Sequence, residues 1–285
     1  MATVVSLINM KGGVGKSTLT FNLAWYSASF VGLKVLAIDL DPQANLSQYF
    51  LGAPKYLALI NKVATKTIVD VFEQFSAPSA LSGAPTLIEP NDVIVKLDEW
   101  PDDGGLLHLA PSRLELAWTL KNPTDKAELL PQFISKVENN YDLILIDCAP
   151  TESILTNAAY RSSRYIFVPV KPEFLATIGL PLLARSLQEF QIMHQNQQLD
   201  MGGIIFNGMR RSKTPPEQKQ SYSDVQATAR KHSWRVFENI AYHSDSFATG
   251  SREGAPIFDT PYARDYVKDE FRGVAEEFLR GIGLK

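Results

Sequence analysis

Two patterns of apolar residues alternate along the chain. Short runs that are apolar throughout and rich in β-branched residues are typical of strands buried on both faces of a sheet. Such runs occur at 3–9, 34–39, 106–110, 143–146, 165–170 and 203–206. Between them, apolar residues recur every three or four positions, as on one face of a helix, over 19–33, 126–139 and 180–194. The alternation predicts strands and helices in turn.

Strands of this kind, separated by helices, indicate a mostly parallel sheet with helices on both faces. The predicted fold class is therefore α/β and doubly wound. With 285 residues, the chain can form one such domain over 1–285 with a full core. The stretch 52–105 is the least regular part, with turn clusters at 76–79 and 100–105 and helical spacing only at 68–75. We expect it to be a surface insertion.

The composition excludes several classes of protein. Hydrophobic residues make up 45% of the chain and charged residues 21%, as in a soluble globular domain. The single cysteine, Cys148, excludes an intramolecular disulfide and any site that needs a cysteine pair, and we expect it to be a small buried hydrophobe. The amino terminus lacks a secretory pattern, and the uncharged run 17–33 is too polar for a membrane span. These features predict a cytoplasmic protein.

A glycine-rich loop, Asn9-Met10-Lys11-Gly12-Gly13-Val14-Gly15-Lys16-Ser17-Thr18, joins the first predicted strand to the first predicted helix. Glycines allow the positive φ angles and close backbone approach that a phosphate-binding loop requires, and the helix amino terminus adds free N–H groups. Lys16 would reach the β and γ phosphates, and the Ser17 hydroxyl would ligate Mg²⁺. Met10 stands where this loop usually has glycine, and Lys11 is an additional lysine.

Carboxylates follow two of the predicted strands. Asp39 and Asp41 come at the end of the second strand, and Asp147 ends the run 143–146. In a parallel sheet these ends lie at the same edge, where ligands bind. Acidic side chains there suit Mg²⁺ and an attacking water.

The motifs Lys11 to Ser17 (Lys-Gly-Gly-Val-Gly-Lys-Ser), 39–43 (Asp-Leu-Asp-Pro-Gln) and 146–150 (Ile-Asp-Cys-Ala-Pro) together resemble the ParA family of partition ATPases, with its deviant Walker A motif. The resemblance covers most of the chain outside 52–105. It implies a Mg-dependent ATPase whose cofactors are ATP and Mg²⁺. The nucleotide-binding residues it implies are Gly12, Gly13, Val14, Gly15, Lys16, Ser17, Thr18 and Asn207.

The resemblance also assigns roles to single residues. Asp41 would position the hydrolytic water, Asp147 would hold Mg²⁺ through water, and the metal site would comprise Ser17, Asp41 and Asp147. Thr18 would contact the α phosphate, and Asn207 would read the adenine edge. Lys11, with Lys16 and Asp41, would complete the catalytic set.

Lys11 is the lysine that, in this family, reaches into the ATP of the partner subunit. A second cation delivered across the dimer would act on the transferring phosphoryl group as an arginine finger does, and only when two subunits close. The resemblance therefore implies a homodimer that forms on ATP binding.

The net charge of −3 gives no basic footprint for the whole chain, but the charge is unevenly distributed. Between 208 and 235 it is +5, which leaves −8 elsewhere. Clustered cations of this kind bind DNA without reading its sequence. The candidate DNA contacts are Arg210, Arg211, Lys213, Lys219, Arg230, Lys231 and Arg235. Arginines that relatives often carry before a Gly-x-Pro-Ile motif are missing at 242–246.

With the resemblance, these cations suggest a cytoplasmic ATPase that associates with the nucleoid in its ATP state. It would position or segregate a plasmid, a chromosome locus or another cargo. A ParB-like or cargo adaptor protein would stimulate hydrolysis. No helix-turn-helix extension precedes the phosphate loop, so operator binding is not expected.

Two other branches of the superfamily give alternative interpretations. Apolar residues at helical spacing over 266–282 could form a membrane anchor as in the MinD branch, which would make the protein a membrane-associated spatial regulator. The polar face of this stretch carries a net charge of −1, which anionic lipid would not favour, so we expect a helix packed on the core and no stable membrane association. A metallocluster protein like nitrogenase iron protein would need two cysteines per subunit.

Overall fold

The computed structural model describes residues 1–62, 65–75, 87–121, 125–174 and 176–285. Its centre is an eight-stranded sheet, counted over these residues, in the order β3-β4-β2-β5-β1-β6-β7-β8. Among these strands, only β3 runs antiparallel to its neighbour. The strands are β1 (Thr3–Leu7), β2 (Lys34–Leu40), β3 (Val95–Trp100), β4 (Gly105–Ala110), β5 (Leu143–Cys148), β6 (Tyr165–Val170), β7 (Asp200–Met209) and β8 (Ala241–Tyr242). The predicted α/β class with a mostly parallel, doubly wound sheet is confirmed.

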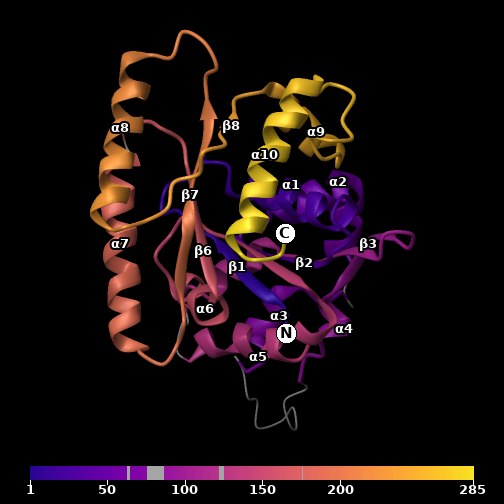
Figure 1. Cartoon of the computed structure of the whole chain (residues 1–285). Coiled ribbons are helices and arrows are strands. Elements are labelled where there is room, and N and C mark those ends of the chain that lie inside the picture. Colours follow the sequence, from indigo (N-terminus) through magenta and orange to yellow (C-terminus); the bar gives the residue numbers. More distant parts are fainter. Residues whose placement is uncertain (63–64, 76–86, 122–124, 175) are drawn as a thin grey trace.

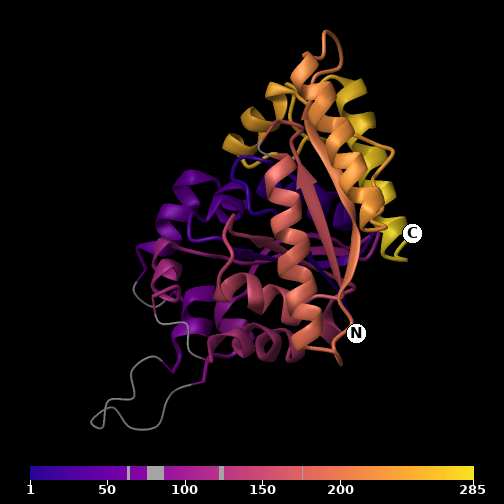
Figure 2. The ribbon, with the colours of Figure 1, turned by 90° about the vertical axis from the view of Figure 1, so that its left-hand side faces the viewer.

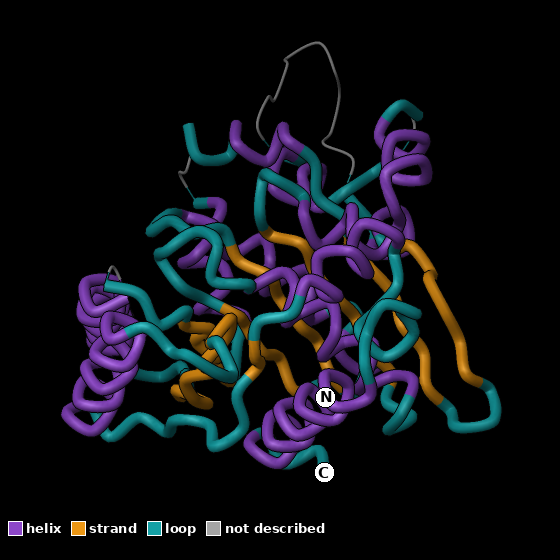
Figure 3. The backbone as a smooth tube through the Cα atoms, turned by 90° about the horizontal axis from the view of Figure 1, so that it is seen from above, coloured by secondary structure: helices purple, strands orange, loops and turns teal. Residues whose placement is uncertain are grey.

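Helices cover both faces of the sheet (Figures 1 and 3). Over the described residues they are α1 (Lys16–Ser29), α2 (Asn45–Ile60), α3 (Ile68–Glu73), α4 (Pro90–Val93), α5 (Leu129–Ser135), α6 (Ile154–Ser162), α7 (Ala176–Met193), α8 (Pro216–Lys231), α9 (Asp245–Glu253) and α10 (Asp265–Gly281). Short 3-10 turns lie at Leu114–Trp118, Lys126–Glu128 and Glu138–Asn140. The predicted helix over 126–139 is therefore wrong as one continuous element, because two of these turns flank α5.

Two apolar clusters separate the layers. One packs α3, α5, α6, α7 and α8 against one face of the sheet, and the other packs α1, α2 and α10 against the opposite face. β5 has no exposed residue along its length, as expected for a central strand covered on both sides. Figure 2 shows α7 and α8 lying along the same side of the molecule.

The carboxyl-terminal helix α10 packs on the core as predicted. Val267, Phe271, Val274 and Phe278 recur at helical spacing and are buried. The face that could have served as a membrane anchor is thus covered by the protein itself. Across the described part of the chain, none of the helices has the length and apolar character needed to cross a bilayer.

The expectation of a surface insertion at 52–105 is wrong in part. Helix α2 continues beyond Gly52, whose φ of 69° interrupts it, to Ile60. β3 pairs with β4 at the edge of the sheet. In α3, Ile68 and Phe72 have 0% exposure and belong to the core. The predicted turn at 76–79 lies outside the described residues.

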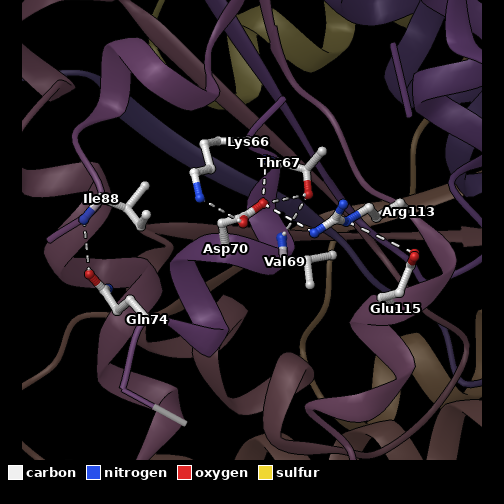
Figure 4. A network of polar contacts seen from close by, with 8 residues as sticks. All are labelled: Lys66, Thr67, Val69, Asp70, Gln74, Ile88, Arg113 and Glu115. Carbon is white, nitrogen blue, oxygen red and sulfur yellow. Dashed lines mark hydrogen bonds and ion pairs between the residues drawn. The ribbon is translucent and has the colours of Figure 1, made fainter. Parts of the chain in front are cut away.

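A polar network fixes α3 at its amino end (Figure 4). Thr67 caps the helix by accepting a hydrogen bond from the Val69 N–H, and Asp70 accepts one from the Thr67 N–H at 2.8 Å. Arg113 forms an ion pair with Asp70. The network ties the short helix to the chain that follows β4.

Candidate nucleotide site

The carboxyl ends of β1, β2 and β5 meet at one edge of the sheet. Leu7 pairs with Asp147 between β1 and β5, and Asp39 pairs with Asp147 between β2 and β5. The phosphate loop leaves β1 at this edge and leads into α1. The sheet order therefore brings together the three motifs that are far apart in sequence.

A cleft of about 400 Å³ opens at this edge. It is lined by Gly12, Gly13, Gly15, Lys16, Ser17, Thr18, Asp41, Gln43, Asn45, Tyr49 and Pro150. Most of the predicted nucleotide residues line it. Val14, within the loop, is buried, and Asn207 supports the loop from β7.

The loop has the backbone geometry of an anion cradle. Gly13 and Gly15 have φ angles of 73° and 89°, and Gly15 is the N-cap of α1. Asn207 donates a hydrogen bond from Nδ2 to the Val14 carbonyl at 2.8 Å. A Cβ on Gly15 would lie 2.0 Å from that Nδ2, so both the φ angle and the space require glycine there. The family resemblance implies that Asn207 reads the adenine edge. In this structure Asn207 holds the phosphate loop through the Val14 carbonyl.

Lys16 is buried within the loop. Its ammonium donates to the carbonyls of Asn9 at 3.1 Å and Lys11 at 3.2 Å. Burial lowers the pKa of Lys16, and the charge of Asp147 opposes this shift. The lysine is therefore already placed under the loop, where a phosphate would replace its carbonyl partners.

Asn9 organises the start of the loop, a role that the sequence interpretation missed. Its Nδ2 donates to the Pro169 carbonyl at 2.7 Å, and its Oδ1 accepts from the Lys11 N–H at 2.9 Å. The only signal in the sequence is a polar residue at the end of an apolar run, and the run predicts a strand that includes Asn9. β1 instead ends at Leu7.

Asp39 and Asp147 have different surroundings. Asp39 accepts hydrogen bonds from the Ser47 hydroxyl at 2.6 Å and the Ser47 N–H at 2.8 Å, so it anchors the start of α2. Burial raises its pKa to about 7. Neither oxygen of Asp147 has a hydrogen-bond partner of good geometry among the described residues, although the side chain is fully buried. Burial and the charge of Asp39 raise the pKa of Asp147 well above its usual value, and the nearby Ser17 hydroxyl opposes the shift only in part.

An unpaired buried carboxylate suits a divalent cation, because a buried charge without a partner is costly. The charges of Lys16 and Asp41 also act on Asp147, so both side chains lie near this carboxylate. Within the described residues, no three His, Cys, Asp or Glu side chains form a complete metal cage. Mg²⁺ would therefore take further oxygens from Ser17, water and phosphate, as it does in nucleotide sites.

Asp41 lines the cleft and is nearly buried. Its Oδ1 accepts a hydrogen bond from the Gln43 N–H at 2.9 Å, which fixes the side chain within its own loop. Cys148, next to Asp147, is 1% exposed, and burial raises the pKa of its thiol. It is the buried hydrophobe that we expected.

Lys11 lies at the rim of the site. Its ammonium forms an ion pair with Glu173 at 2.6 Å, and Lys171 contacts the other oxygen of Glu173 at 2.7 Å. In the single subunit the Lys11 ammonium is thus paired with a carboxylate of its own chain. Glu173 was not among the predicted site residues, because an acidic residue after a strand carries no distinctive signal.

The basic segment divides into two groups. Arg211 forms a two-nitrogen ion pair with Glu270 of α10, and Arg235 pairs with Glu277, which is 3% exposed. In the single subunit these two arginines are therefore engaged with carboxylates of α10. Five are exposed and form no ion pair with any described residue: Arg210, Lys213, Lys219, Arg230 and Lys231.

The fold and the loop define a phosphate-loop nucleotide-binding protein of the deviant Walker A type. A sequence family described as an AAA domain matches residues 2–201. The chain is 32% identical over 206 residues to the sporulation initiation inhibitor protein Soj of Bacillus subtilis, covering 72% of each protein. It is 30% identical over 215 residues to the chromosome partitioning protein ParA of Caulobacter vibrioides, covering 75% of this chain and 73% of that protein.

Among solved structures, an ATP complex of a McdA variant from Cyanothece superposes with a TM-score of 0.78 at 17% identity, covering 100% of this chain and 97% of the McdA chain. At this identity the likeness shows the fold alone. The sequence matches show more: the chain belongs to the ParA family of partition ATPases.

Proposed function

We propose that this protein is an ATP-dependent dimerising ATPase that binds DNA non-specifically and positions or segregates a cargo. The observation that carries the proposal is the placement of one unpaired buried carboxylate, Asp147, beside a phosphate loop with a second lysine, Lys11, at its rim. A loop that only joined β1 to α1 would require neither the unpaired carboxylate nor the second lysine.

Each residue of the cleft has a chemical task. The N–H groups of Gly12 to Ser17 would surround the phosphates, with the amino terminus of α1 and the Lys16 ammonium adding positive potential. Ser17 and Asp147 would hold Mg²⁺, which when bound neutralises phosphate charge. Asp41, fixed by the Gln43 N–H, would orient the attacking water. ATP and Mg²⁺ are thus the proposed cofactors, and hydrolysis to ADP and phosphate the proposed reaction.

Lys11 would complete this site in a second subunit. A cation that arrives from the partner places charge on the transferring phosphoryl group and makes hydrolysis depend on dimer formation. The rim position of Lys11, with 19% of its side chain exposed, supports such an exchange. We therefore propose a homodimer formed on ATP binding.

The proposed output is DNA binding through the exposed cations around α8. The five cations of one subunit would give weak, salt-dependent contacts with phosphates, and a dimer would present twice as many. Binding would then require the ATP state, which would place the protein on the nucleoid in that state and in the cytoplasm otherwise. A ParB-like or cargo adaptor protein would stimulate hydrolysis and release. The relative from Caulobacter vibrioides, which is named a chromosome partitioning protein, supports this role.

A gel shift with a duplex of arbitrary sequence tests the proposal. The wild-type protein should retain DNA with Mg-ATP at low salt and release it with ADP. Asp41→Ala should bind ATP, dimerise and retain DNA while hydrolysing slowly. Glu89→Gln, which changes an exposed partner of Lys136 that does not line the cleft, is a matched control and should behave as wild type. Equal DNA binding with ATP and ADP, or none with ATP at low salt, would contradict the proposal.

A further inference from the structure

A chain of polar contacts links the phosphate loop to the basic helix α8. It begins at the Lys11 ammonium, which contacts Glu173 Oε2 at 2.6 Å. Glu173 lies just after β6, and its other oxygen contacts Lys171 at 2.7 Å. The two lysines lower the pKa of Glu173, so the carboxylate is ionised between them.

The next residue continues the chain of contacts. The Phe174 N–H donates a hydrogen bond to Glu217 Oε1 at 3.1 Å. Glu217 lies in the first turn of α8, two residues before the exposed Lys219. Helices α7 and α8 pack against each other (Figure 2), so α8 also borders the element that follows this segment.

A second contact couples the same segment to β7. The aliphatic stem of Lys171 lies over Gly208, whose φ is 73° and whose Cβ position would be 3.5 Å from Lys171 Cε and Cγ. Two residues further on, the Arg210 N–H donates to Gln218 of α8 at 3.2 Å. The segment 171–174 therefore touches both the start of α8 and the strand end that leads to it.

We propose that Glu173 is a positioning residue: it holds Lys11 in the single subunit, and the segment 171–174 transmits the departure of Lys11 to α8. The inference rests on the proposed function, because it assigns to these contacts the coupling between the nucleotide site and the DNA-binding surface.

The contacts of these side chains show how the coupling works. While the subunit is alone, Lys11 and Lys171 both pair with Glu173, and Glu217 accepts the N–H of the next residue, Phe174. When Lys11 turns to the phosphates of a second subunit, Glu173 keeps Lys171 as its partner and the segment 171–174 loses one of the contacts that fix it. The loosened segment weakens the bond from Phe174 to the charged Glu217 and releases the first turn of α8, which carries part of the basic surface.

Two variants separate the hold of Glu173 on Lys11 from the transmission to α8. Glu173→Gln removes the charge that holds Lys11, so the ATP dimer should form at a several-fold lower protein concentration, measured by sedimentation velocity. Glu217→Gln leaves the Lys11 pair in place, so dimerisation should match wild type. Its DNA affinity, measured by fluorescence anisotropy with a duplex of arbitrary sequence, should show a several-fold smaller ratio between the ATP state and the nucleotide-free state.

Glu89→Gln is again the matched control, and the melting temperature of each variant checks that it folds. If Glu173→Gln dimerises as wild type does, the hold on Lys11 is refuted. If Glu217→Gln keeps the wild-type ratio of DNA affinities, the transmission to α8 is refuted. A wild-type protein that fails to bind DNA with ATP would instead contradict the proposed function, and the dimerisation measurement would still judge the role of Glu173.

Discussion

Asp39 and Asp147 are register partners on the adjacent strands β2 and β5, yet the fold supplies well-placed hydrogen-bond donors to Asp39 alone. Ser47 satisfies Asp39, which thereby serves the structure by fixing the start of α2. Asp147 is left as a buried carboxylate whose oxygens have no such partner among the described residues. We therefore propose that Asp39 serves stability and that Asp147 serves a cation.

Asp147→Asn should remove the stabilisation that Mg-ATP gives without destabilising the ligand-free protein. A neutral amide avoids the cost of a buried unpaired charge, so the ligand-free melting temperature at pH 8 should equal or exceed that of wild type. Thermal unfolding with and without Mg-ATP measures both effects. Asp200→Asn, at an exposed pair with Arg164, is the control. A variant that keeps the full Mg-dependent stabilisation would exclude Asp147 from the metal site.

Asn207→Ala should weaken ATP and GTP binding by a similar factor, about 3- to 10-fold. The structure shows Asn207 bonded to the Val14 carbonyl, and one such neutral hydrogen bond contributes about 0.5–1.5 kcal/mol. Titration calorimetry with both nucleotides measures the two affinities. A loss confined to ATP would instead favour reading of the adenine edge as the main role of Asn207.

Glu277→Gln should destabilise the protein by about 1–3 kcal/mol at neutral pH, because this buried side chain accepts bonds from Arg235, Glu238 and Asn239. Burial alone would raise the pKa of Glu277, but bonds from Asn239, Glu238 and Arg235 outweigh it and lower the pKa below the ordinary 4.5.

A lowered pKa gives stability that is present above the ordinary value and is lost as the pH falls through the folded-state value. The difference in free energy of unfolding between wild type and Glu277→Gln should therefore shrink below about pH 4. Urea denaturation over a pH series checks this, with Glu253→Gln on the exposed side of α9 as the control. A difference that stays constant down to about pH 3 would contradict the assignment.

Replacing Lys219, Arg230 and Lys231 by alanine should weaken DNA binding and flatten its salt dependence. Every phosphate that the variant no longer neutralises makes the slope of log affinity against log salt shallower by about 0.9. Arg211→Ala should leave that slope unchanged and lower the melting temperature, because its partner is Glu270. Anisotropy titrations at several salt concentrations measure the slope. A shallower slope for Arg211→Ala, with an unchanged slope for the triple variant, would instead place the DNA surface at Arg211.

The sequence was sufficient to predict the fold class, the phosphate loop and the strand-end aspartates, because these depend on local pattern and on the geometry of parallel sheets. It could not distinguish Asp39 from Asp147, since the donor to Asp39 is Ser47, eight residues away on another element. Nor could it show that Arg211 and Arg235 are neutralised by α10, because those pairs span 59 and 42 residues. The edge strand β3 was missed because its residues alternate between half-buried and exposed.

In the proposed dimer, Lys11 leaves Glu173 to complete the nucleotide site of a second subunit. Sedimentation velocity of wild type and Lys11→Ala with Mg-ATP and with ADP tests this exchange. We predict that wild type is a dimer with ATP and a monomer with ADP, whereas Lys11→Ala binds ATP and remains a monomer. A Lys11→Ala protein that dimerises with ATP as wild type does, or a wild-type protein that remains a monomer with ATP, would contradict this exchange of Lys11.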